Sequence, residues 1–95
     1  MAKAIPFDSA EYLDRPEAIA DYLSEALATG DSEFIAQAIG TVARAQGMTS
    51  VARGAGVSRE NLYRALGSGG KPELETVMKV LGALGVQLVA KPKVA

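Results

Sequence analysis

Apolar residues recur at helical spacing in three stretches, residues 14–30, 31–47 and 73–84, and each stretch is bounded by polar or glycine-rich segments. This spacing is typical of amphipathic helices that bury one face. We expect the apolar positions of residues 31–47 and 73–84 to face a core. The apolar positions are Ile19, Leu23, Ala26 and Leu27; Phe34, Ile35, Ala38, Ile39 and Val42; and Leu74, Val77, Met78, Leu81 and Leu84.

The ends of the first two predicted helices carry helix start and stop signals. Asp14 is an N-cap residue type, and Pro16 follows in the first turn, where its missing N–H does no harm. Asp31 is placed to cap the second helix. Gly30 and Gly47 end the two helices because glycine tolerates the left-handed backbone of a helix end.

Between these helices and residues 73–84 lie two shorter amphipathic patterns separated by Gly56. They predict helices over residues 50–55 and 59–66, with Gly56 at a bend that needs a positive φ. Thr49 and Ser58 precede the two helices and are both N-cap residue types. The expected buried seam consists of Val51, Ala55, Val57, Leu62 and Ala65, and the small side chain of Ala52 allows the second helix to approach closely.

Residues 48–66 therefore have the features of a helix-turn-helix, whose second helix enters the DNA major groove. An ordinary helical hairpin inside a bundle is the alternative. We expect Ser58 and the helix N-terminus to hold a phosphate. The arginines would reach guanine edges or phosphate, and Glu60 would accept from a cytosine amine. The predicted DNA-binding residues are Thr49, Ser58, Arg59, Glu60, Asn61, Tyr63, Arg64 and Lys71.

Two of these residues have a second interpretation. Tyr63 could be half core, with its ring resting on the first helix of the pair. Lys71 lies in the glycine-rich loop 67–72, which lacks the G-x-x-x-x-G-K-[ST] pattern of a nucleotide-binding loop. We expect this loop to be a connector whose amides and lysine touch the DNA backbone.

The two chain ends depart from the helical pattern. Residues 1–13 form an arm in which Pro6 disfavours helix. Residues 86–91 alternate and predict one short C-terminal β-strand. A lone strand needs a partner for its backbone, and we favour the same strand of a second copy over the arm or another protein, because two-fold proteins read two half-sites.

The composition limits the kinds of function that are possible. Ninety-five residues, 48% of them hydrophobic, suit one domain over residues 1–95. The chain has no cysteine and no histidine, so we expect no disulfide, no metal site, no cofactor and no enzymatic activity. Neither a signal core nor an apolar run long enough for a membrane span is present, and we expect a cytoplasmic protein.

The charge is divided between the two halves of the chain. Residues 1–47 carry three basic and eight acidic side chains, whereas residues 48–95 carry seven basic and three acidic ones, for a total of −1. The basic half holds the predicted helix-turn-helix, where cations neutralise phosphate. The acidic half suits a basic protein partner, or it is simply a solvated surface.

The chain resembles the addiction-module antidote family, the HigA-like antitoxins with an Xre/Cro-type helix-turn-helix. The resemblance covers residues 7–88. It is carried by Phe7-Asp8-Ser9-Ala10-Glu11-Tyr12-Leu13, Asp21-Tyr22-Leu23, Gly47-Met48-Thr49, Val51-Ala52, Gly56-Val57-Ser58-Arg59-Glu60-Asn61-Leu62-Tyr63, Thr76-Val77 and Leu84-Gly85. It implies an all-α, five-helix, lambda-repressor-like domain. The departures are Gly54, where a bulkier polar residue is usual, and a looser glycine-rich loop.

The resemblance also implies a function. Such proteins are antitoxins of type II toxin–antitoxin pairs that neutralise a basic RelE/HigB-like toxin and repress their own operon as dimers on operator DNA. A stand-alone phage-type regulator without a toxin is the alternative. The residues expected to bind the toxin are Phe7, Glu11, Tyr12, Asp14, Glu17, Asp21 and Glu25. The arm could instead cover the protein's own core.

Overall fold

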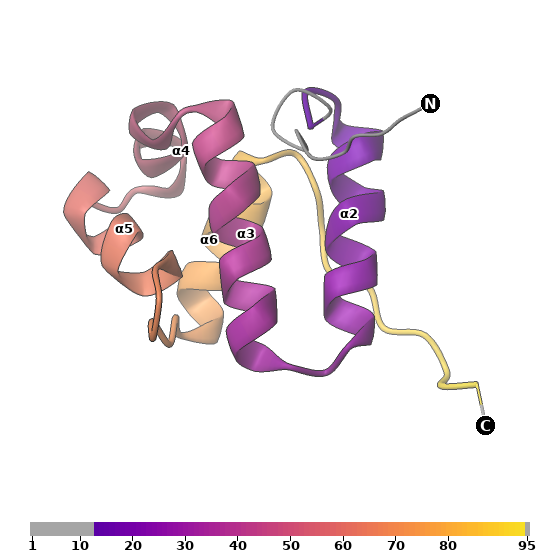
Figure 1. Cartoon of the computed structure of the whole chain (residues 1–95). Coiled ribbons are helices and arrows are strands. Elements are labelled where there is room, and N and C mark those ends of the chain that lie inside the picture. The colour runs from indigo at the N-terminus through magenta and orange to yellow at the C-terminus, as the bar shows by residue number, and fades with distance from the viewer. Residues whose placement is uncertain (1–12, 95) are drawn as a thin grey trace, which may run out of the picture.

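Five helices, and the loops that join them, make up the part of the chain that the computed structural model describes, residues 13–94 (Figure 1). Within these described residues, the prediction of an all-helical fold with five helices is confirmed. No helix in this part of the chain is both long enough and apolar enough to cross a membrane. The helices are α2 (Pro16–Ala28), α3 (Ser32–Gln46), α4 (Met48–Ala55), α5 (Arg59–Leu66) and α6 (Leu74–Ala83).

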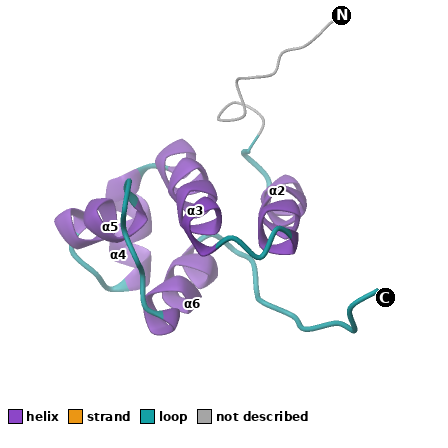
Figure 2. Cartoon of the chain, turned by 60° about the horizontal axis from the view of Figure 1, so that its bottom comes forward, coloured by secondary structure: helices purple, strands orange, loops and turns teal. Residues whose placement is uncertain are grey.

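Helix α3 is the central element, since it packs against α2 on one side and against α4 and α5 on the other (Figures 1 and 2). Helix α6 packs chiefly against α4. The buried side chains form a hydrophobic core cluster to which all five helices contribute. Burying each large apolar side chain stabilises the fold by about 1.5–3 kcal/mol. The largest side chains that are fully or almost fully buried are Leu13, Ile19, Ile39, Val42, Leu62, Leu66 and Val80.

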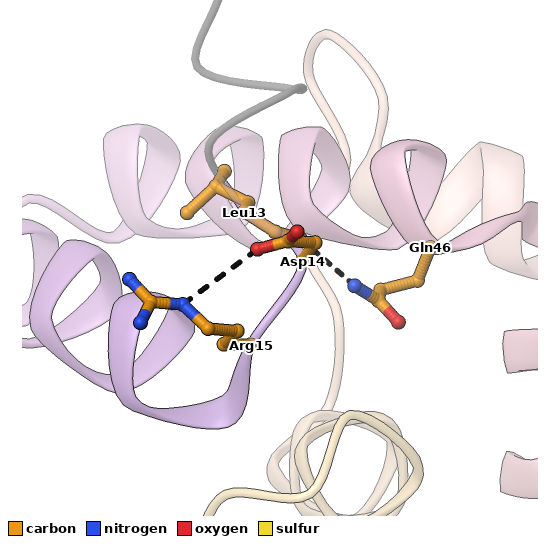
Figure 3. Close-up of polar contacts among 4 residues, drawn as sticks. All are labelled: Leu13, Asp14, Arg15 and Gln46. Carbon is orange, nitrogen blue, oxygen red and sulfur yellow. Dashed lines mark hydrogen bonds and ion pairs between the residues drawn. The ribbon is translucent and has the colours of Figure 1, made fainter.

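The start of α3 follows the predicted capping chemistry. The Asp31 carboxylate accepts hydrogen bonds from the amides of Glu33 and Phe34 at 3.1 and 3.2 Å. The prediction that Asp14 caps α2 is wrong. Arg15 occupies the N-cap position without a side-chain cap, and the Asp14 carboxylate instead lies 3.8 Å from the Arg15 Nε (Figure 3).

Leu13, the last residue of the predicted arm, packs onto the protein's own core. Its side chain is fully buried, and its carbonyl accepts a hydrogen bond of 2.8 Å from Gln46 Nε2 at the end of α3 (Figure 3). This bond joins positions 33 residues apart in the sequence. The end of the arm thus belongs to the fold rather than to a partner.

Two glycines allow helices to approach closely. A Cβ on Gly40 would lie 2.8 Å from the carbonyl oxygen of Leu66, so the glycine lets the end of α5 rest on α3. A Cβ on Gly54 would lie 3.1 Å from the Cβ of Ala83, at the contact between α4 and α6. The bulkier residue expected at position 54 from the family resemblance would require Ala83 of α6 to move by a few tenths of an ångström.

The prediction of a β-strand over residues 86–91 is not confirmed. No strand forms within residues 13–94, so the segment pairs with no other strand of the same chain there. Its first amide is already used, because Val86 N–H donates to the Leu81 carbonyl at 3.0 Å and completes the end of α6. The segment runs alongside α2 as a loop (Figure 1). Leu88 lines a small hollow there together with Leu23 and Leu27.

The prediction that all the apolar residues of α3 and α6 face the core is also wrong in part. Phe34 is 49% exposed, Leu74 66% and Met78 56%. The buried face of α6 is centred on Val80 and Leu81. Because the helix is oriented by these two residues, Leu74 and Met78 point toward solvent.

Candidate nucleic-acid interface

Helices α4 and α5 meet at the predicted bend. Gly56 adopts the left-handed conformation, with φ 72° and ψ 29°. Its amide donates to the Arg53 carbonyl at 3.3 Å, and the amide of Val57 donates to the Ala52 carbonyl at 3.1 Å. These two bonds form a Schellman motif, which ends a helix and turns the chain sharply. Val57 then packs against the core, half-buried.

Helix α5 starts directly after this bend. Ser58 is its N-cap, and the Ser58 hydroxyl oxygen accepts from the Asn61 amide at 3.0 Å, as predicted. The corresponding prediction for Thr49 is wrong. Helix α4 begins at Met48, with Gly47 as N-cap and no side-chain cap, so Thr49 lies exposed in the first turn. The chain turns into α4 two residues earlier than an N-cap at Thr49 requires.

One face of α5 is buried and the other is exposed. Leu62 and Leu66 are 0% and 2% exposed, and they hold the helix on the core. Residues on a helix are spaced by about 100°, so the polar side chains point away from these leucines. The predicted outward orientation is therefore confirmed, and the exposed residues of α5 are Arg59, Glu60, Asn61, Tyr63 and Arg64.

On one flank of this exposed face, Arg59 pairs with Tyr63, one helical turn later. The Arg59 guanidinium carbon lies 5.3 Å from the centre of the Tyr63 ring, within cation–π range. Its Nη2 also donates to the Tyr63 hydroxyl at 3.4 Å. Tyr63 is 43% exposed, so its ring supports the arginine on the surface.

On the opposite flank, Arg64 Nη1 donates to the Asn61 side-chain oxygen at 2.8 Å. Both residues line a hollow of about 690 Å³ between α5, the glycine-rich loop and the start of α6. Lys71 lies on the loop side of the same hollow. The structure thus brings Asn61, Arg64 and Lys71 together around one concave surface, while Thr49 sits on a different helix.

Three polar residues that line this hollow were not among the predicted site residues, namely Ser68, Glu73 and Thr76. Ser68 belongs to the loop and the other two to the start of α6. Their closeness to Lys71 in the sequence could have suggested them. The packing of α6 on α4 brings them beside α5, and no local sequence pattern predicts that packing.

The residues predicted to bind a basic partner lie at the other side of the molecule. Glu17, Asp21 and Glu25 recur every four residues on α2 and are all exposed, and Asp14 is exposed just ahead of them. Residues four apart share one helix face, so the three glutamate and aspartate side chains of α2 form one acidic stripe. Phe7, Glu11 and Tyr12 lie outside the described residues.

Comparison with known proteins identifies the family of this chain. A family model described as "Probable addiction module antidote protein" matches residues 3–92. An uncharacterized protein of Haemophilus influenzae is 49% identical over 81 residues, which cover 85% of this chain and 84% of that protein. No solved structure gives a significant match. The chain belongs to the family of probable addiction module antidote proteins.

Proposed function

We propose that this protein is a cytoplasmic antitoxin of a type II toxin–antitoxin pair. It neutralises a basic RelE/HigB-like toxin, and as a dimer it represses its own operon by inserting α5 into operator DNA. The single observation that carries the DNA-binding part is the orientation of α5. Leu62 is fully buried on the inner face, and both Arg59 and Arg64 are exposed on the outer face.

The exposed residues of α5 suit the major groove. Arginine forms paired hydrogen bonds with guanine O6 and N7, asparagine does the same with adenine, and a glutamate accepts from cytosine. The Arg59–Tyr63 contact limits the freedom of the arginine before it meets a base, which lowers the entropy lost on binding. We assign Arg59, Glu60, Asn61 and Arg64 to base or phosphate contacts, as an Xre/Cro-type recognition helix makes them.

The surroundings of α5 suit the DNA backbone. Lys71 and the amides of the glycine-rich loop lie across the hollow from Arg64, where they can reach a phosphate. Thr49 at the start of α4 and Ser58 at the start of α5 are exposed at helix N-termini, which favour phosphate oxygens.

The acidic stripe of α2 is the surface that we assign to the toxin. Helix α2 contains no lysine or arginine, so Glu17, Asp21 and Glu25 present uncompensated negative charge. Such a surface steers a cationic partner and repels DNA. Asp14, whose carboxylate is paired with Arg15, lies just ahead of it, and Phe7, Glu11 and Tyr12 precede it in the sequence.

The DNA-binding part is tested by fluorescence anisotropy with a duplex from upstream of the protein's own gene. Arg59→Ala and Arg64→Ala should each weaken binding by about 1–3 kcal/mol where the side chain reads a base, and relax the preference at that base pair. Arg15→Ala removes the same charge at the start of α2 and is the control. If all three variants bind the duplex like wild type, α5 does not contact DNA.

The antitoxin part is tested by co-expressing the chain with the basic protein encoded beside its gene. Co-purification and relief of growth arrest support a toxin partner. If the wild-type chain binds its upstream DNA but neither binds nor protects against any neighbouring product, the protein is a stand-alone regulator and the acidic stripe is a solvated surface.

A further inference from the structure

A small hollow lies between the last two turns of α2 and the start of α3, two helices that pack side by side (Figure 1). Its volume is about 250 Å³. Two aromatic residues line it, Tyr22 from α2 and Phe34 from α3, and Glu25 contributes a carboxylate from the acidic stripe. We call it the Tyr22–Phe34 hollow. The small residues that complete its wall are Ala26, Thr29 and Ala38.

The two rings of the hollow are held by the fold but are not covered by it. Tyr22 is half-buried and packs against the core cluster, which limits the freedom of its ring. Phe34 is 49% exposed, although its spacing on α3 predicts a core position. A large ring left half in water forgoes stabilisation that a covering group would supply. The face of an aromatic ring also attracts a cation.

The polar groups of the hollow leave Glu25 available to a ligand. The Thr29 hydroxyl is already used, because it donates to the Ala26 carbonyl at 2.7 Å and accepts from the Asp31 amide at 3.1 Å. None of the ion pairs within residues 13–94 involves Glu25. A carboxylate that pairs with no cation in this part of the chain therefore stands beside two aromatic rings.

The charge around the Tyr22–Phe34 hollow selects a cationic ligand. Residues 16–33 contain five acidic side chains and no lysine or arginine. The hollow lies at the carboxyl end of α2, where the helix dipole is negative and the last turn carries no basic residue. This surface repels the phosphates of a nucleic acid or a membrane and attracts a basic protein.

We propose that the Tyr22–Phe34 hollow holds one arginine side chain of a basic protein partner. The planar guanidinium group stacks on aromatic faces and also forms paired hydrogen bonds with a carboxylate. Tyr22 and Phe34 would contact its faces, and Glu25 would accept its hydrogen bonds. Arginine and aromatic residues packed in a pocket are frequent anchors of protein interfaces.

This inference deepens the proposed function and rests on it for the basic partner. The acidic stripe attracts the toxin over a distance, which sets the rate of association. The hollow acts after contact, and close contacts chiefly set the rate of dissociation. The two roles can therefore be separated by kinetics.

The first test measures the kinetics of binding to the basic protein encoded beside the gene, by biolayer interferometry. Glu25→Gln should raise the dissociation rate by about ten-fold or more, because it removes the acceptor of the guanidinium. Asp21→Asn is the matched control. It removes the same charge from the acidic stripe one turn earlier, outside the hollow, so it should slow association equally but change the dissociation rate by less than about two-fold.

A second pair of variants isolates the ring at position 34. Phe34→Leu keeps an apolar side chain but removes the ring, and it should raise the dissociation rate by roughly three-fold to ten-fold. Phe34→Tyr keeps the ring and should dissociate as wild type does. Phe34, Glu25 and Asp21 are all exposed, so the variants should fold, which circular dichroism checks. If Phe34→Leu and Phe34→Tyr dissociate at equal rates, or Glu25→Gln and Asp21→Asn do, the hollow is not an anchor and the inference is wrong.

The last test needs no toxin. An oligoarginine peptide titrated into the full chain should shift the ring signals of Tyr22 and Phe34 in NMR spectra, and it should bind more tightly than an oligolysine peptide of the same length. If the peptide shifts signals of the acidic stripe but not those of the two rings, no arginine enters the hollow and the inference fails. If the rings respond but no neighbouring protein binds, the arginine site stands and the toxin part of the proposed function is wrong.

Discussion

Helices α2 and α5 both bury an apolar face, but their exposed faces carry charges of opposite sign. Leu23 of α2 and Leu62 of α5 are 4% and 0% exposed, and each fixes its helix against α3. The outer face of α2 carries three acidic side chains and no basic one. The outer face of α5 carries Arg59 and Arg64 with a single acid, Glu60.

This difference shows how the fold and the partners are specified by separate residues. The apolar inner positions determine where a helix packs, and they tolerate many outer surfaces. The outer charges decide which class of molecule approaches each side of the protein. Because α2 and α5 lie on opposite sides of α3 (Figure 1), a basic protein and DNA can be bound without sharing a surface.

The largest effect on stability should come from the buried leucines that α2 and α5 both place on the core. Leu62→Ala removes a fully buried side chain and should lower the free energy of unfolding by about 2–5 kcal/mol, and Leu23→Ala should have a cost in the same range. Urea unfolding followed by circular dichroism measures both. Val89→Ala, at a position that is 76% exposed, is the control, and a change below about 0.5 kcal/mol is expected. A loss at Val89 as large as at Leu62 would mean that the C-terminal segment packs differently.

The next effect should come from the outer face of α2. Replacing Glu17, Asp21 and Glu25 together by Gln, Asn and Gln removes its negative charge without changing the shape of the side chains. Association with the proposed basic toxin should slow by about ten-fold to a hundred-fold at low salt, because electrostatic steering is lost. Stopped-flow or biolayer interferometry at several salt concentrations measures this rate.

The same triple variant should bind DNA as wild type does, since α2 lies on the far side of α3 from α5. The matched change on the other side, Arg59→Gln with Arg64→Gln, should weaken DNA binding and leave the toxin association rate unchanged. If either variant alters both partners equally, the two surfaces are not separate.

A smaller effect should appear where α5, but not α2, depends on a glycine of α3. The new methyl group in Gly40→Ala meets the Leu66 carbonyl oxygen at 2.8 Å, and overpacking of this kind costs about 1–3 kcal/mol. The higher helix propensity of alanine returns about 1 kcal/mol. The net loss of stability, measured by thermal or urea unfolding, should lie between about 0 and 2 kcal/mol.

Gly82→Ala is the matched control for this glycine. Gly82 is also helical, but a Cβ there has no neighbour within 4 Å, so the substitution should stabilise the protein by about 0.5–1 kcal/mol. If Gly40→Ala stabilises the protein to the same extent, α3 and α5 are not in close contact at Leu66.

Features that depend on neighbouring residues in the chain were predictable from the sequence. The bend at Gly56, the cap at Ser58, the cap at Asp31 and the bounds of α5 are all confirmed. Each follows from a hydrogen bond or backbone conformation within a few residues, which the residue type alone favours. The fold class followed because several such signals agreed along the chain.

Features that depend on distant residues were not predictable in this way. Helical spacing placed Leu74 and Met78 on the same apolar face as Leu81. In the structure α6 packs on α4, Val80 and Leu81 are buried, and Leu74 and Met78 are exposed. The C-terminal segment alternates like a strand, yet no second strand exists within residues 13–94 to pair with it. The sign of the charge on each side could be read from the sequence. Which residues gather around the hollow beside α5 could not, because α5, the glycine-rich loop and α6 all contribute.

The smallest effect concerns how the two helices begin. Both Asp14 and Ser58 have the chemistry of an N-cap, but only the Ser58 side chain accepts a backbone amide, at 3.0 Å. Ser58→Ala should therefore destabilise the protein by about 1 kcal/mol. Asp14→Ala should change stability by less than about 0.5 kcal/mol, because it removes only an exposed contact to Arg15 at 3.8 Å. Differential scanning calorimetry resolves the two as a clear fall in Tm for Ser58→Ala against none for Asp14→Ala. Equal losses would show that Asp14 caps α2 after all, and that the two helices begin in the same way.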